Sequence, residues 1–189
     1  MPTNKIKNTK SIKMKKIRLF FSLLLLLGSF NYVQAQLSKD NTVKEWERAK
    51  AYTKEYLETM PADKYSLKPT PEMRSFAEQM LHLTDANYSF GATITGATSP
   101  LAMGEAEKTV DQSKENVTKI VMGGYDFIID NIKKMTPEQM NETVKLFGKF
   151  ELTKAAALNK CFEHQTHHRG QTTVYIRLAG VKPPQEKLF

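Results

Sequence analysis

The sequence of 189 residues contains a single cysteine, Cys161. One cysteine cannot form a disulfide within the chain, so this fold is not held by internal disulfides, even in an oxidising compartment. A hydrophobic core must stabilise it instead, and the 40 % of apolar residues can build one. With 25 % charged residues, the composition is typical of neither a disordered nor a fibrous protein.

Acidic residues are missing from the first 35 positions, which hold seven lysines and arginines. The chain as a whole has 28 basic and 20 acidic residues and a formal net charge of +8. Outside the first 35 positions, 21 basic residues face 20 acidic ones, so the net charge there is only +1. No basic stripe interleaved with aromatic residues appears there. We therefore expect no nucleic-acid partner, because nothing attracts phosphates strongly.

The sequence also lacks an apolar run long enough to span a membrane. Residues 19–27 form a largely apolar run of nine, whereas a spanning helix needs about 20 residues. Basic residues precede this run and Val33-Gln34-Ala35 follows it, which is the three-part pattern of a cleavable signal peptide. We expect residues 1–35, with Met14 as an alternative start, to be this signal. The mature chain, residues 36–189, would be periplasmic or secreted without a stable membrane anchor; an uncleaved anchor is the alternative.

Four segments of the mature chain have apolar residues at steps of three and four, as in amphipathic helices. We expect helices at residues 42–60, from Thr70-Pro71 to about 90, from about 111 to 134, and at 152–178. Residues 91–103 are predicted to form a loop, and a short helix is expected after Thr136-Pro137. Residues 144–150 alternate, but an isolated strand there would have no partner. The sequence predicts one all-α domain, a four-helix bundle.

Two adjacent glycines, Gly123 and Gly124, interrupt the third predicted helix. A glycine inside a helix costs about 1 kcal/mol relative to alanine. The pair therefore indicates either a kink or a close contact with another helix, and a tolerated weak spot is the alternative.

The four histidines are His82 on the second predicted helix and His164, His167 and His168 on the fourth. Residues four apart on a helix project from the same face, so His164 and His168 can converge on one metal ion. His167 points about 100° away from His168, which leaves His82 as the remaining histidine for a third ligand. Three neutral imidazoles with an open position are typical of a catalytic metal site. The alternative is a set of structural histidines near a helix end.

The sequence from His164 to Gln171, His-Gln-Thr-His-His-Arg-Gly-Gln, is followed by an apolar helix and by Leu-Ala-Gly-Val-Lys-Pro-Pro at residues 178–184. This C-terminal pattern resembles the signature of the DinB/YfiT-like superfamily. The resemblance extends to Arg74-Ser75-Phe76 and His82-Leu83, and covers about residues 40–184.

The resemblance implies a four-helix bundle of up-down-down-up type with a divalent metal ion, zinc or nickel, held by His82, His164 and His168. His167, Arg169 and Gln171 match the signature but are not ligands in the family pattern. The resemblance also implies chemistry on a small-molecule substrate: a hydrolase or a thiol-dependent transferase in which the metal activates water or a thiol. Thiol cosubstrates are chiefly cytoplasmic, so export favours hydrolysis. The alternative is a non-enzymatic metal-binding or stress-related bundle, and a homodimer is left open.

Three further residues lie near the predicted ligands in sequence. Cys161 is seven residues before His168 and shares its helix face, so its thiolate could reach the metal or act as a nucleophile; the alternative is a small buried apolar residue. Asp85 and Glu163 could orient an imidazole through its second nitrogen, or could be exposed.

Overall fold

The computed structural model describes Met14, Phe20 and residues 39–189. The predicted signal peptide therefore lies outside the described residues, apart from those two positions, and its cleavage stays a prediction. Within the described part of the chain, no helix is both long and apolar enough to cross a bilayer.

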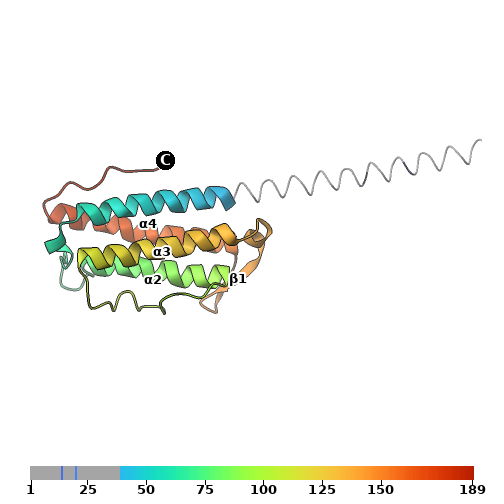
Figure 1. Cartoon of the computed structure of the whole chain (residues 1–189), viewed down its shortest axis with the longest axis horizontal. Helices are drawn as coiled ribbons and strands as arrows, with labels where there is room; N and C mark the ends of the chain where they lie inside the picture. Colours follow the sequence, from blue (N-terminus) through green and yellow to red (C-terminus); the bar gives the residue numbers. More distant parts are fainter. Residues whose placement is uncertain (1–13, 15–19, 21–38) are drawn as a thin grey trace, which may run out of the picture.

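Four long helices lie side by side: residues 39–59, α2 (Phe76–Thr95), α3 (Lys114–Lys134) and α4 (Lys154–Leu178). The first helix and α4 run in one direction, and α2 and α3 run in the other (Figure 1). Since α2 and α3 are parallel, residues 96–113 return along the bundle to connect them. This is the all-α, up-down-down-up arrangement expected from the resemblance.

The second helix begins later than the sequence analysis predicts. Its N-cap is Ser75, whose hydroxyl accepts from the Glu78 amide while the Glu78 carboxylate accepts from the Ser75 amide. This reciprocal capping satisfies two donors that a helix start would leave without partners. Thr70-Pro71 only starts a turn, closed by the bond from the Met73 amide to the Thr70 carbonyl. The helix also continues beyond the expected end, to Gly96 in the left-handed conformation.

The expectation that residues 144–150 have no strand partner is wrong. Strands β1 (Thr143–Leu146) and β2 (Phe150–Thr153) form a two-stranded antiparallel hairpin in which Leu146 pairs with Phe150. The turn places Phe147 and Gly148 at positive φ, which closes the chain back on itself. The partner was missed because it is the segment directly before the fourth helix. The short helix η2 (Glu138–Asn141) precedes the hairpin, and η1 (Ala62–Lys64) follows the first helix.

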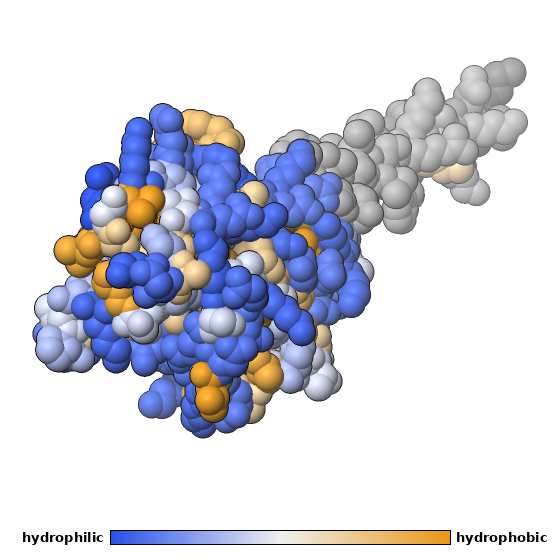
Figure 2. All heavy atoms as spheres, turned by 60° about the vertical axis from the view of Figure 1, so that its left-hand side comes forward, coloured by the Kyte–Doolittle hydropathy of each residue, from blue (hydrophilic) through white to orange (hydrophobic). Residues whose placement is uncertain are grey.

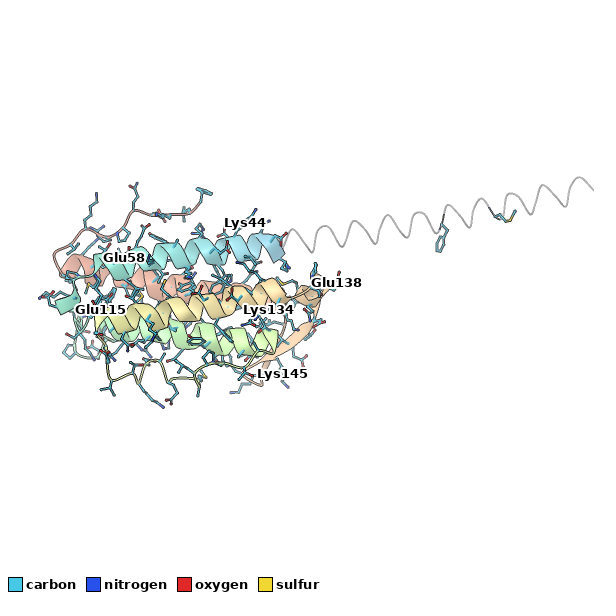
Figure 3. All side chains as sticks on the ribbon, viewed as in Figure 1. Lys44, Glu58, Glu115, Lys134, Glu138 and Lys145 are labelled. Atoms are coloured by element: carbon cyan, nitrogen blue, oxygen red, sulfur yellow. The ribbon has the colours of Figure 1, made fainter. Side chains whose placement is uncertain are left out.

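One hydrophobic core runs through the bundle. Trp46 of the first helix is fully buried and packs edge-on against Tyr125 of α3 and Phe162 of α4. Charged side chains such as Lys44, Glu58 and Lys134 project outward (Figure 3). The face in Figure 2 is mainly hydrophilic, with apolar side chains in small scattered groups.

The glycine pair marks a close contact between α2 and α3, and α3 continues through it. A Cβ atom on Gly124 would lie 2.7 Å from Cγ2 of Thr84, and one on Gly123 would lie 3.0 Å from the Tyr88 hydroxyl. A side chain at residue 124 would thus collide with α2. The parallel pair of helices can approach this closely only because α3 carries no side chain there.

Candidate metal centre

Three histidines from two helices meet between α2 and α4. The ring centroid of His82 lies 5.3 Å from that of His164 and 4.5 Å from that of His168. The two rings on α4 are 4.3 Å apart. One nitrogen from each ring lies within 4.8 Å of the others, a grouping that could hold one metal ion. The structure thus brings together the three histidines singled out from the sequence.

The sequence of α4 explains why its two histidines face inward. The helix begins after Thr153, whose hydroxyl accepts from the Ala156 amide, two residues later than the predicted start at 152. Ala157, Cys161 and Tyr175, at one- and two-turn spacings from the histidine pair, are fully buried. This inward face carries His164 and His168 to α2, where each ring is partly buried. His167 lies on the exposed side of α4, as its offset of about 100° predicts.

The orientation of His82 is set by Glu107, in the connection between α2 and α3. Its Nδ1 lies 3.0 Å from Oε2 of Glu107. The other carboxylate oxygen of Glu107 accepts from Nε of Arg74. Burial raises the pKa of Glu107, but the bonds from Arg74 and His82 outweigh it and leave the pKa lowered. An ionised carboxylate only accepts hydrogen bonds, so Nδ1 of His82 donates and its Nε2 is the nitrogen left to face a ligand.

Asp85 holds the segment that carries Glu107. Its two carboxylate oxygens accept from the backbone amides of Ala106 and Glu107, each over 2.9 Å. Asp85 is nearly buried, with 5 % of its surface exposed. It therefore supports the histidine cluster indirectly, through Glu107, rather than by touching an imidazole. Glu163, the other carboxylate considered from the sequence, is exposed and pairs with Lys160.

Gln79 orients His168 as Glu107 orients His82. Its Oε1 lies 2.9 Å from Nδ1 of His168, and its Nε2 donates to Oε1 of Gln171 over 2.8 Å. Because the amide nitrogen is used toward Gln171, the amide oxygen is the atom that faces the imidazole and accepts from it. Nε2 of His168 then keeps its lone pair. Gln79 is one turn before His82 on α2, which is the only sequence signal that could have indicated it.

His164 differs from the other two because its Nδ1 is buried and has no hydrogen-bond partner among the described residues. Burial, followed by the nearby imidazoles, lowers the pKa of His164 to about 4. The same causes lower the pKa of His168 to about 3. Both rings are therefore neutral at neutral pH, the form in which an imidazole binds a metal.

Taken as a donor set, these residues fit a divalent metal ion. Two imidazoles have one nitrogen fixed as a donor by Glu107 and Gln79, which leaves the second nitrogen free as a ligand. The third offers a buried, unpaired nitrogen. Such outer partners are the usual supports of metal-binding histidines.

Cys161 takes no part in this group. Its thiol is fully buried and lies 3.7 Å from Oδ1 of Asn87. Burial raises the pKa of the thiol far above its usual value, so it stays protonated. Of the two alternatives from the sequence, the structure favours the small buried apolar residue.

An open depression of about 620 Å³ reaches the cluster at His168 and Glu107. Arg74 and Lys68 bring positive charge to its wall, and Glu72 and Glu78 bring negative charge. Glu107 was missed from the sequence because it lies in an irregular segment without periodicity.

The DinB family model matches residues 33–188 of the chain. In sequence, the chain is 27 % identical over 131 residues to the uncharacterised protein YjoA of Bacillus subtilis (strain 168), an overlap that covers 68 % of this chain and 82 % of YjoA.

Solved structures of similar fold include a DinB-like protein of Bacillus cereus ATCC 10987, with a TM-score of 0.69 and 18 % identity over 78 % of this chain and 97 % of that one. The crystal structure of YjoA has a TM-score of 0.60 and 22 % identity over 79 % of this chain and 96 % of that one. A conserved protein of Enterococcus faecalis has a TM-score of 0.61 and 15 % identity, over 74 % and 95 % of the two chains. At these identities the likeness shows the shared fold.

Proposed function

Because the chain belongs to the DinB family, we propose that it is an exported metal-dependent enzyme acting on a small molecule. His82, His164 and His168 would hold one divalent ion, zinc or nickel. The observation that carries this proposal is the convergence of one nitrogen from each ring within 4.8 Å, together with the separate partners that orient two of the rings. Hydrolysis is favoured over thiol transfer, because the predicted signal peptide would take the chain away from cytoplasmic thiols.

A divalent ion held by three imidazoles would supply Lewis acidity, lowering the pKa of a water or thiol and polarising a carbonyl group. The side chains around the site fix the orientation and the protonation of the imidazoles that would bind such an ion. Glu107 and Gln79 each accept from one imidazole and so select the tautomer whose second nitrogen is free. The lowered pKa values of His164 and His168 keep protons from competing for the ligand nitrogens.

The depression beside His168 would receive the substrate. At its wall Lys68 pairs with Glu78 and Arg74 with Glu107, a polar lining that suits a polar molecule. Glu107 is committed to His82 and Arg74. Its lowered pKa makes it a weak base, so its role is to position His82.

Metal analysis tests the ligand assignment. Purified mature protein should retain about one divalent ion per chain, and His164→Ala should lose it. His167→Ala is the matched control, since this histidine lies on the same helix but faces solvent. Equal metal content in all three proteins, or none in the wild type after incubation with zinc and nickel, would contradict the proposal.

Turnover separates an enzyme from a protein that only binds metal. The mature protein would be assayed with ester, amide and thiol-adduct substrates, with and without a chelator. Activity that the chelator abolishes and added metal restores supports the enzyme. Metal binding without any chelator-sensitive turnover supports a metal-binding bundle instead.

A further inference from the structure

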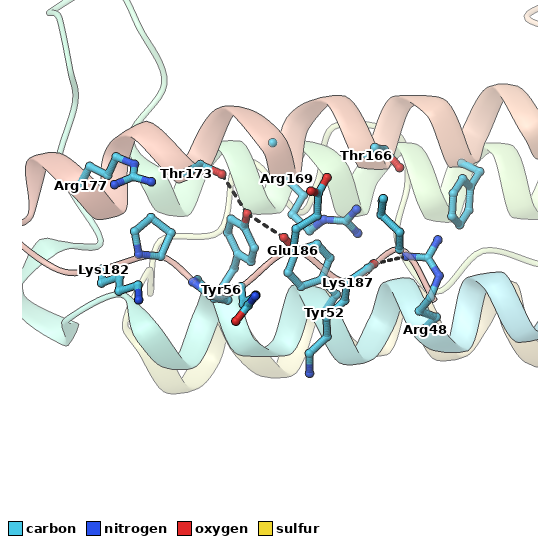
Figure 4. Close-up of a pocket in the computed structure, with 16 residues that line it drawn as sticks. Arg48, Tyr52, Tyr56, Thr166, Arg169, Thr173, Arg177, Lys182, Glu186 and Lys187 are labelled. Atoms are coloured by element: carbon cyan, nitrogen blue, oxygen red, sulfur yellow. Dashed lines mark hydrogen bonds between the residues drawn. The ribbon is translucent and has the colours of Figure 1, made fainter.

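A second cavity lies on the other side of α4 from the histidines, between the first helix and the C-terminal tail. We call it the tail cleft; its volume is about 770 Å³. Its walls are Arg48, Tyr52 and Tyr56 of the first helix, positions 162–177 of α4, and residues 182–188 of the tail (Figure 4). The metal site and the tail cleft therefore share α4 but use different faces of it.

The deepest charge in the tail cleft is the guanidinium of Arg169, which is only 5 % exposed. Its Nη1 donates to Oε1 of Gln165 over 3.0 Å, and its carbon lies 4.6 Å from the centre of the Tyr52 ring. Gln165 also accepts from the Tyr125 hydroxyl, which is 2.8 Å away. This buried network holds the guanidinium in one place from the inside of the bundle.

The Arg169 guanidinium has more N–H donors than its hydrogen bonds within the bundle use. A guanidinium has five N–H groups; Nη1 donates to Gln165, and a further hydrogen bond from the guanidinium acts on the buried Tyr125 hydroxyl. Arg169 lines the cleft, and none of its nitrogens is among the buried atoms without a partner. No carboxylate of residues 39–189 forms an ion pair with it. Burying a cation without a counter-ion is costly.

The other side chains that line the tail cleft also favour an anionic ligand. The cleft is lined by five basic side chains and one acidic one: Arg48, Arg169, Arg177, Lys182, Lys187 and Glu186. Lys187 is paired with Glu55, and Arg48 with Glu45. Arg169, Arg177 and Lys182 remain without ion pairs in the described part of the chain.

The one acidic side chain that lines the tail cleft, Glu186, belongs to the tail. In Figure 4 Glu186 lies on the tail, beside Tyr52 and Arg169, and its side chain is exposed. Both charges act on the Tyr52 hydroxyl: burial and the neighbouring Tyr56 raise the pKa of Tyr52 to about 12, with Arg169 lowering it and Glu186 raising it. The tail is tethered by the bond from Nη1 of Arg48 to the Lys187 carbonyl, 2.6 Å long, and by the ion pair of Lys187 with Glu55.

We propose that the tail cleft binds a small organic carboxylate through the guanidinium of Arg169, and that Glu186 on the C-terminal tail beside it opposes this binding by its negative charge. A carboxylate matches the fork of an arginine, and Tyr52 and Phe162 offer aromatic surface for an apolar body. This site is separate from the proposed metal chemistry and does not depend on it.

Titration of the mature, chelator-treated protein with 2-naphthoate, followed by calorimetry, tests this proposal. Removing metal first ensures that the carboxylate cannot bind at the histidines. Glu186→Gln should bind about tenfold more tightly than wild type, because a negative charge beside the cleft is gone. Glu142→Gln is the control: it makes the same charge change at a residue that pairs with Lys154, away from the cleft, and should bind like wild type.

Arg169→Gln should weaken binding at least about tenfold, with folding checked by the fluorescence of Trp46, which packs on Phe162. Should Arg169→Gln fail to fold, the comparison of Glu186→Gln with Glu142→Gln decides alone. Three results would overturn the proposal: equal affinities for those two variants, unchanged affinity in folded Arg169→Gln, or no binding to Glu186→Gln up to about 5 mM.

Discussion

The side-chain oxygen of Gln79 lies 2.9 Å from Nδ1 of His168 and accepts a hydrogen bond from it, although the two residues are 89 positions apart in the chain. The contact joins α2 to α4 at the histidine cluster. It also fixes which nitrogen of His168 is left for a ligand, since the Gln79 amide is oriented by Gln171.

Replacing Gln79 by leucine should weaken zinc binding about 10- to 100-fold, the usual cost of losing an outer hydrogen bond to a metal-binding histidine. The dissociation constant would be measured by competition with a chromophoric chelator. Gln112→Leu, in the loop before α3, serves as the control and should bind zinc like wild type. If Gln79→Leu binds zinc as tightly as this control, His168 does not depend on Gln79.

Asp85→Asn should loosen the segment that carries Glu107. An asparagine can accept from the Ala106 and Glu107 amides with only one oxygen, so one charge-assisted bond is lost at a cost of about 1–3 kcal/mol. Hydrogen exchange should accelerate at these two amides while the core of α3 stays protected. Glu163→Gln is the control, because it removes the charge of an exposed carboxylate outside this segment. Unaltered exchange at Ala106 and Glu107 would show that another contact holds the segment.

Gly124→Ala should destabilise the bundle by about 1–3 kcal/mol, because the new Cβ would lie 2.7 Å from Thr84 and force α2 and α3 apart. Gly170→Ala makes the same substitution in α4 where nothing lies within 4 Å, and it should stabilise the protein by about 0.5–1 kcal/mol through helix propensity. Urea unfolding of both variants measures the difference. A stable Gly124→Ala would mean that the two helices separate at no cost.

The metal-free protein should lose stability as the pH falls below about 6.5, the ordinary pKa of histidine. The pKa values of His164 and His168 are lowered in the folded state to about 4 and about 3. The unfolded chain therefore binds these protons first, and stability decreases until the pH reaches the folded values. Urea midpoints between pH 7.5 and 4 would show this. His168→Gln should flatten the curve, and the exposed His167→Gln should leave it unchanged; identical curves for the two variants would contradict the expectation.

The local signals in the sequence predicted some elements better than others. The periodic apolar residues predict α3 and α4, because they act within a few residues of the chain, although both helices begin two or three residues later than predicted. The sequence predicts the start of α2 at Thr70-Pro71 instead of Phe76, because two capping patterns follow each other and only one can be used. The hairpin was missed because its second strand is short and directly adjoins a helix start.

By itself, the sequence determined that the fold has no disulfide, that its basic charge is concentrated before residue 36, and that two histidines share one face of the last helix. These follow from composition and from the fixed geometry of a helix. Only the tertiary structure decided that His82 meets that face and that Glu107 and Gln79 orient two of the rings. It also decided that Asp85 is buried and that Arg169 faces a cleft without a counter-ion. Those relationships join residues distant along the chain, and they depend on the direction of each helix and on the path of the loop between α2 and α3, which local periodicity does not encode.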